Sequence, residues 1–473
     1  MDLQLLKPSR GQEAPIYLQL YRRYREAIAS GKLRPGDRVP SVRSLASELG
    51  LARGTVETAY QMLVSEGYFV TRGPAGTAVS GRLAKLPGNG HAEVPAPAEP
   101  AAPLPPGGSL PFQLGVPALD AFPRKTWARL AARSLRTLEM AAMVAPDPAG
   151  YAPLRHAIAA YLGISRGIIC SHEQVFVTAG YRGALDLVRH TLLHSGDTGW
   201  HEDPGYLFAR HFLQRAGLRL EPVPVDEEGL NVAEGLRRAA QARFAVVTPT
   251  HQSPTGVAMS LPRRLELLEW AASRRAWIIE DDYDSEFRYQ GRPLPALKSL
   301  DRDGRVLYTG TFSKVLLPGL RLAYLVVPAA VAGKFREAAA HLPGPGSILP
   351  QAMVADFMEQ GHFARHLRRM RSLYAARHGY LLDALGQHLG KEVQVRPQAG
   401  GIHVLAMLTG RRSDKAVAAA AAARGLAVLA LSDWRMRKSS QGGLLMGFAN
   451  FAAPGDAVAA VRRLKAVLAA APK

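Results

Sequence analysis

A lysine flanked by hydroxyl groups and followed by an arginine marks the most reactive segment of the chain. Lys314 follows a strand-like apolar run at 306–308, and Thr311, Ser313 and Arg321 lie close to it in the sequence. An amine that is partly desolvated and near other cations has a lowered pKa and reacts readily with carbonyl groups. The two hydroxyls and the guanidinium are suited to binding a phosphate. This segment therefore predicts a carbonyl-reactive lysine beside an anion site.

A second group of polar residues follows another apolar run, at 277–279. Asp281 and Tyr283 come directly after it, and ligands of open α/β sheets bind at the carboxyl ends of strands. A carboxylate in this position can hold a proton on a ring nitrogen, and a phenol can hydrogen-bond a ring hydroxyl. We therefore expect both side chains to face the same ligand as the lysine.

Two upstream segments complete the pattern. Gly180, Tyr181 and Arg182 precede a helix-like stretch at 183–193, and backbone N–H groups at the start of a helix bind anions. Tyr206 supplies an aromatic ring that can stack on a planar ligand. Pyridoxal phosphate needs an imine-forming lysine, an acid for its ring nitrogen and donors for its phosphate. The pattern therefore predicts this cofactor, held as an internal aldimine on Lys314, and it contains no metal site.

The first 80 residues have a different pattern. Apolar residues at helical spacing predict helices from Tyr17 to Ile28, from Ser41 to Leu49 and through Val56 to Leu63, and 68–80 predicts two strands around a tight turn. Two short helices with a tight turn and a hairpin form a winged helix-turn-helix. The second helix of such a motif enters the major groove of double-stranded DNA.

The residues expected to contact DNA lie on three parts of this head. Arg43 begins the first helix of the motif, Arg53 and Thr55 begin the recognition helix, and Arg72 precedes the turn of the wing. Arginines in these places contact phosphates or base edges. The full predicted set is Ser41, Arg43, Arg53, Thr55, Thr58, Arg72, Gly76 and Thr77.

Composition divides the chain into three parts. We predict a winged helix-turn-helix at 14–82, a proline-rich linker at 83–108 and a large domain at 109–470. In the large domain, strand-like runs alternate with helical stretches, which indicates an α/β fold with a mostly parallel sheet. The net charge of +20 favours a polyanionic partner. The basic stretch at 365–371 is interpreted either as a solvated helix face or as an auxiliary DNA contact.

The expected location is the cytoplasm. The chain has no long uncharged apolar run that would span a membrane, and its start lacks the pattern of a secretory signal. Its single cysteine, Cys170, excludes an internal disulfide framework and supplies no thiol pair for zinc.

Motifs in both parts of the chain carry a resemblance to known families. Residues 35–43, 53–56 and 66–68 resemble the head of GntR-family regulators, and the order of Asp281, Lys314 and Arg321 resembles fold type I aminotransferases. A chain that joins the two is similar to the MocR subfamily of regulators. The resemblance implies a homodimer that binds operator DNA and pyridoxal phosphate.

Two departures from the aminotransferase pattern bear on function. Ser253 stands where aminotransferases carry an asparagine that contacts the cofactor ring, and His251 or Gln252 is a possible substitute. Leu445 stands where they carry an arginine for the substrate α-carboxylate, although Arg435 or Arg437 could reach the site. Without a bidentate guanidinium, an amino acid loses much of the alignment that its reaction needs.

These departures predict a regulator and not an efficient enzyme. The expected effector is pyridoxal phosphate itself, as in subfamily members that control vitamin B6 synthesis, or an amino-acid aldimine. The alternative is an active aminotransferase with an accessory DNA-binding head.

Overall fold

The computed structural model describes residues 14–81, 109–291, 294–396, 398–439 and 441–470. The chain divides into two compact units, here called the head (14–81) and the body (109–470), which are described separately. The predicted linker at 83–108 lies outside the described residues.

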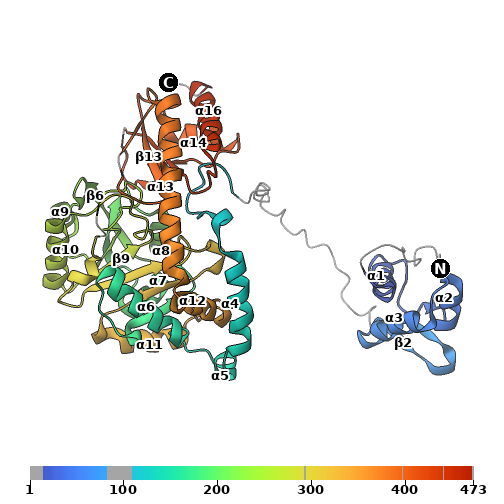
Figure 1. The fold of residues 1–473 in the computed structure, drawn as a ribbon. Helices are drawn as coiled ribbons and strands as arrows, with labels where there is room; N and C mark the ends of the chain where they lie inside the picture. Colours follow the sequence, from blue (N-terminus) through green and yellow to red (C-terminus); the bar gives the residue numbers. More distant parts are fainter. Residues whose placement is uncertain (1–13, 82–108, 292–293, 397, 440, 471–473) are drawn as a thin grey trace. The chain divides into compact units, whose positions relative to one another are not determined.

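The head is a three-helix unit with a small antiparallel sheet in the order β1-β3-β2 (Figure 1). Its elements are α1 (Ile16–Ala29), β1 (Arg38–Val39), α2 (Val42–Leu49), α3 (Arg53–Ser65), β2 (Phe69–Thr71) and β3 (Thr77–Val79). The Ser41 hydroxyl caps α2 by accepting from the Ser44 N–H at 3.1 Å, and Gly50 ends α2 in the left-handed conformation. The predicted winged helix-turn-helix is confirmed.

The periodic apolar residues of the three helices form the core of the head. Leu20 and Tyr24 of α1 pack with Val56 and Leu63 of α3 and with Phe69 of β2, and all five are buried. This packing leaves the opposite side of α3 exposed to solvent.

The body is built on an eight-stranded sheet in the order β4-β11-β10-β9-β8-β5-β6-β7. The strands are β4 (Val175–Thr178), β5 (Thr198–Asp203), β6 (Arg219–Asp226), β7 (Gly229–Leu230), β8 (Phe244–Val247), β9 (Trp277–Asp282), β10 (Val306–Thr311) and β11 (Ala323–Val326). The five central strands from β10 to β6 are parallel, whereas β11 runs antiparallel to both of its neighbours. The predicted mostly parallel sheet is confirmed.

Helices cover both faces of this sheet, which explains why its strands are continuously apolar. The helices of the body are α4 (Arg124–Thr137), α5 (Met140–Val144), α6 (Ala152–Arg166), α7 (Tyr181–Leu192), α8 (Leu207–Arg215), α9 (Val232–Ala239), α10 (Leu261–Arg274), α11 (Ala329–His341), α12 (Ile348–Glu359), α13 (His362–Leu389), α14 (Asp414–Ala422), α15 (Leu431–Trp434) and α16 (Pro454–Ala470). Phe176 of β4 packs toward α7 and α11, while its neighbours Val175 and Val177 pack toward α6 and α12. The sheet is therefore the middle layer of three.

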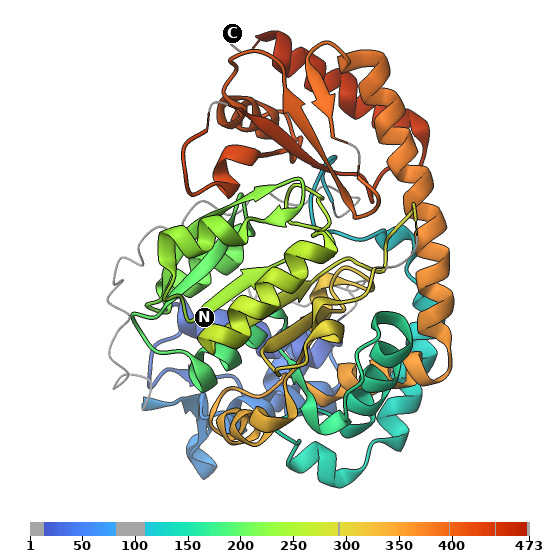
Figure 2. The same cartoon turned by 90° about the vertical axis from the view of Figure 1, so that its left-hand side faces the viewer.

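A second, antiparallel sheet lies toward the C-terminus, in the order β12-β13-β15-β14. Its strands are β12 (Val393–Val395), β13 (His403–Leu408), β14 (Leu429–Ala430) and β15 (Gly443–Gly447). The long helix α13 runs from the large sheet to this small sheet (Figure 2). Among the helices of the described segments, none combines the length and apolarity needed to cross a bilayer.

Candidate functional site

A cavity of about 530 Å³ opens at the carboxyl ends of the central strands of the body. Eleven residues singled out from the sequence line it, which are Gly180, Tyr181, Arg182, Tyr206, Ser253, Asp281, Tyr283, Thr311, Ser313, Lys314 and Arg321. They come from segments far apart in the sequence, and the parallel sheet brings them together because its strands end at one edge.

Lys314 lies three residues beyond the end of β10 and projects into this cavity. Its Nζ donates to the carbonyl oxygen of Gly115 at 3.1 Å. Burial lowers the pKa of the Lys314 amine, although Asp284 and Asp281 oppose that effect. The amine therefore loses its proton more easily than an exposed lysine and is available as a nucleophile.

Asp281 is the cavity-facing member of three consecutive acids at the end of β9. Glu280 and Asp282 point to the opposite side because side chains alternate along a strand. Glu280 accepts from the backbone N–H groups of Leu297 and Lys298, both at 2.8 Å.

Asp282 also points away from the cavity, and it pairs with Arg166 at 2.6 Å. Burial and the nearby Asp282 raise the pKa of Asp281 to about 8. The Asp281 carboxyl therefore carries a proton at neutral pH.

Another group of cavity residues can bind anions. Helix α7 begins at Tyr181, directly after Gly180, whose φ of +79° is in the region that favours glycine. The guanidinium carbon of Arg321 lies 4.0 Å from the position a Cβ on Gly180 would take, so Arg321 covers this turn. The hydroxyls of Thr311 and Ser313 line the same cavity. A helix N-terminus, two hydroxyls and a guanidinium therefore converge.

Behind the cavity, His251 supports the Tyr283 side chain. The His251 Nδ1 atom lies 3.0 Å from the Tyr283 hydroxyl and 3.1 Å from both carboxylate oxygens of Asp284. Burial and Asp284 raise the pKa of Tyr283 well above its ordinary value, and a hydrogen bond with Ser253 opposes that rise. Ser253 lines the cavity, whereas His251 is not among the described lining residues.

Gln252, the other candidate to replace the missing asparagine, holds its own loop together. Its amide nitrogen donates to Glu202 at 3.0 Å and to the carbonyl oxygen of Pro204 at 2.9 Å. Its amide oxygen accepts from Thr255.

The wall next to β15 is apolar. Leu445 is fully buried and packs with Leu405, Leu431 and Trp434. Trp434, Leu114 and Leu429 line the cavity here.

The two arginines considered as substitutes lie elsewhere. Arg437 donates to Glu221 at 3.1 Å on the surface, and Arg435 is absent from the described lining. Among the described lining residues, Arg182 and Arg321 are the two guanidinium groups.

Sequence reasoning missed several lining residues, of which Gly115 and Trp434 are the most informative. Gly115 has a φ of +78°, and a Cβ there would lie 2.5 Å from the Lys314 Nζ atom. Nothing in the local sequence distinguishes Gly115 from a turn glycine, because Lys314 is about 200 residues away in the chain.

In the head, the residues predicted to contact DNA are all at least partly accessible to solvent. Ser41, Arg43, Arg53, Thr58, Arg72 and Gly76 are exposed, and Thr55 and Thr77 are half-buried. Arg53 is the first residue of α3, while the Thr58 hydroxyl donates to the Gly54 carbonyl oxygen at 2.9 Å. Thr58, like Ser41 at the start of α2, therefore uses part of its hydrogen-bonding capacity within the head.

Comparison with known proteins gives a two-part match. Residues 16–79 match the family of bacterial regulatory proteins of the gntR family, and residues 114–441 match aminotransferase class I and II. In the body, the chain resembles the crystal structure of LysN, an α-aminoadipate aminotransferase from Thermus thermophilus. That likeness has a TM-score of 0.69 and 31% identity over 77% of this chain and 93% of LysN.

Two relatives are similar over both parts. The probable rhizopine catabolism regulatory protein MocR of Rhizobium meliloti is 37% identical over 94% of this chain and 92% of its own length. The pyridoxine biosynthesis transcriptional regulator PdxR of Corynebacterium glutamicum is 35% identical over 92% of both chains. The protein thus combines a GntR-type DNA-binding head with an aminotransferase class I and II body. It belongs to the MocR subfamily of GntR-family regulators.

Proposed function

We propose that this protein is a transcription regulator whose DNA binding responds to pyridoxal phosphate bound in the body. The observation that carries the proposal is the single cavity in which Lys314, Asp281 and the anion-binding residues meet. The membership in a regulator family supports the DNA-binding half.

The residues present fit the cofactor. Its phosphate would be held by Arg321, Thr311, Ser313 and the N-terminus of α7. Asp281, whose pKa is raised to about 8, would share its proton with the ring nitrogen. Tyr283, supported by Ser253 and His251, would hydrogen-bond the ring hydroxyl. Tyr206 would stack on the ring. Gly180, Tyr181 and Arg182 would surround the phosphate.

Pyridoxal phosphate supplies an aldehyde that condenses with primary amines. The lowered pKa of Lys314 provides an unprotonated amine for this condensation, and the Gly115 carbonyl oxygen orients that amine. The buried wall around Leu445 and Trp434 keeps water from this end of the cavity.

We infer that the effector is pyridoxal phosphate itself. Leu445 offers no guanidinium to an amino-acid carboxylate, and Arg437 is engaged by Glu221. The relative PdxR, a regulator of pyridoxine biosynthesis by name, supports the same effector. The alternatives to this proposal are an amino-acid effector and slow turnover of an amino acid. The presence of Lys314 favours both of these alternatives.

For the DNA side, we propose that Arg53 and Thr55 contact bases or backbone in the major groove. Arg43 and Ser41 would contact phosphates, and the wing residues Arg72, Gly76 and Thr77 would contact the sugar-phosphate backbone, with Thr58 in support. We further propose a cytoplasmic homodimer with a head at 14–82, a linker at 83–108 and a body at 109–470.

The direct test measures operator affinity with and without pyridoxal phosphate at one fixed salt concentration. The operator would be selected from random duplex DNA by the full-length protein. We expect the cofactor to change affinity about 5- to 150-fold, the usual range of coupling between two sites. Unchanged affinity, together with repeated turnover of amino acid and keto acid, would instead identify an enzyme with an accessory head.

Replacing Gly115 tests the placement of Lys314. In Gly115→Ala, the new Cβ would lie 2.5 Å from Nζ, so the lysine must move and its condensation with pyridoxal phosphate should slow at least about tenfold. Stopped-flow absorbance would measure that rate.

The matched control is Gly167→Ala, which has a similar φ of +68° and has its nearest neighbour, Ser299, at 3.6 Å. It carries the same backbone cost of about 1 to 2 kcal/mol but should condense at the normal rate. Equal rates in all three proteins would show that Gly115 does not position Lys314.

A further inference from the structure

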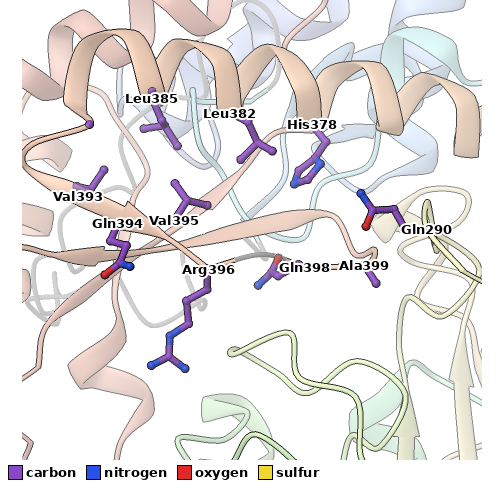
Figure 3. Close-up of a pocket in the computed structure, with 12 residues that line it drawn as sticks. Gln290, His378, Leu382, Leu385, Val393, Gln394, Val395, Arg396, Gln398 and Ala399 are labelled. Carbon is purple, nitrogen blue, oxygen red and sulfur yellow. The ribbon is translucent and has the colours of Figure 1, made fainter.

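A second cavity, of about 740 Å³, lies between α13 and the segment that contains β12 (Figure 3). His378, Leu382, Leu385 and Gly386 of α13 form one side, and the other side includes Val393, Gln394, Val395, Arg396, Gln398 and Ala399. We call it the α13 groove. It shares no described lining residue with the cofactor cavity, and its volume lies within the range of about 300 to 1,000 Å³ typical of small-molecule sites.

The lining of the α13 groove has a defined chemistry. Leu382, Leu385, Val393 and Val395 provide apolar walls, and the exposed Arg396 is the one permanently charged side chain among the described lining residues. Figure 3 shows the leucines of α13 on the same side of the β12 segment as Val395, whereas the Arg396 side chain extends from this segment away from α13. An occupant should therefore have an apolar body and an anionic group.

An unsatisfied polar atom adds a second requirement. Gln398 is 8% exposed, and its amide oxygen has no hydrogen-bond partner among the described residues. A buried acceptor without a partner is unfavourable. This oxygen is closed off from solvent, so an N–H or O–H donor of an occupant would reach it by shifting the Gln398 side chain. Gln290 and Gln394 offer further amide groups along the groove.

We propose that the α13 groove binds a small amphipathic organic anion that carries a hydrogen-bond donor, and that this ligand modulates the cofactor site. The proposal that the groove binds this ligand depends on the groove alone. The proposal that the ligand modulates the cofactor site rests on the proposed function. The groove thus adds a second effector site to the regulator.

The segment from Gln398 to His403 connects the two cavities. The Gln398 amide nitrogen donates to the Thr255 carbonyl oxygen at 3.3 Å, in the loop that carries Ser253. Gly401 packs against the His251 ring so closely that a Cβ would clash. Ile402 and His403 line the cofactor cavity itself. A ligand that moves Gln398 therefore acts on residues that border the cofactor.

Glycines in α13 provide a matched pair of variants. A Cβ on Gly386, which lines the groove, or on Gly379, which does not, meets no atom within 4 Å. Leucine has a higher helix propensity than glycine, so both substitutions favour the helix by roughly the same amount. Only Gly386→Leu places a side chain in the groove, so a folding defect would not explain a difference between the two.

The probe is 8-anilinonaphthalene-1-sulfonate, an apolar anion with one N–H donor, titrated by fluorescence into full-length protein saturated with pyridoxal phosphate. We expect one saturable site per chain, weakened at least about tenfold by Gly386→Leu and by Arg396→Gln. Gly379→Leu should bind as the unmodified protein does. Saturating probe should also change the release rate of pyridoxal phosphate at least twofold.

Affinity that is unchanged in both groove variants would overturn the site, and so would the absence of saturable binding. A change in oligomeric state in Gly386→Leu alone would instead show that a second copy of the chain covers the groove. If no cofactor band forms at all, the proposed function fails, while the probe titration still decides whether the groove binds.

Discussion

Lys314→Ala should abolish the visible absorption band that forms when the protein is mixed with pyridoxal phosphate. The band requires a carbon–nitrogen double bond between the cofactor and an amine, and Lys314 is the one lysine among the described residues that line the cavity. The phosphate and ring contacts remain in the variant, so equilibrium dialysis should still detect weaker, noncovalent binding. Added ethylamine should restore a band, because the shortened side chain leaves room for an external amine.

Lys314→Arg is the matched control for charge. It keeps a cation near Asp284 and Asp281, the acids that act on Lys314, but it cannot form the double bond. Its band should therefore be lost as well. A band that persists in either variant would mean that another amine reacts, and Lys314 would lose its central role.

Much of the cofactor site could be predicted from the sequence because its residues follow strand-like runs. Asp281 ends β9, Lys314 follows β10, and Gly180 lies between β4 and α7. Parallel strands end at one edge of a sheet, so residues in these places converge without any long-range information. Alternation along β9 also separates Asp281 from Glu280, which faces the backbone of Leu297 and Lys298.

Contacts between distant segments could not be predicted in this way. The approach of Gly115 to Lys314 depends on how the start of the body passes over the cavity. A glycine has no side chain whose chemistry would indicate such a contact. The contact of His251 with Asp284 and Tyr283 joins two loops whose relative position only the packed sheet fixes. The α13 groove has the same origin, since it forms between a helix and a strand segment.

The head was more predictable because its core is local. Helices α2 and α3 are separated by three residues, Gly50 to Ala52, and Leu45, Val56 and Leu63 meet within about twenty residues of chain. Periodicity alone therefore predicts which side is buried and leaves the other side for DNA. Which of the exposed residues reads a base depends on the DNA, and the sequence of the head does not encode that choice by itself.

Asp281→Asn should weaken pyridoxal phosphate binding while stabilising the empty protein. Asparagine cannot supply the proton that the ring nitrogen needs, so a charge-assisted hydrogen bond worth about 2 to 3 kcal/mol is lost, or roughly 30- to 160-fold in affinity. In the empty protein, burial and Asp282 raise the pKa of Asp281 from 3.8 to about 8. Spectroscopic titration would measure the affinity, and urea unfolding from pH 5 to pH 9 would measure stability.

The sign of the pH effect follows from proton binding. Between pH 4 and pH 8, the folded state holds a proton on Asp281 that the unfolded state has released, so the free energy of unfolding falls as pH rises. The slope from this group is roughly 1.4 kcal/mol per pH unit and disappears in the asparagine variant.

Glu280→Gln is the control, because Glu280 is buried with a pKa of about 7 but is not among the described residues that line the cavity. It should change the pH dependence of stability and leave cofactor affinity within about twofold. Equal losses of affinity in both variants would indicate a general structural defect and would remove Asp281 from its role as the partner of the ring nitrogen.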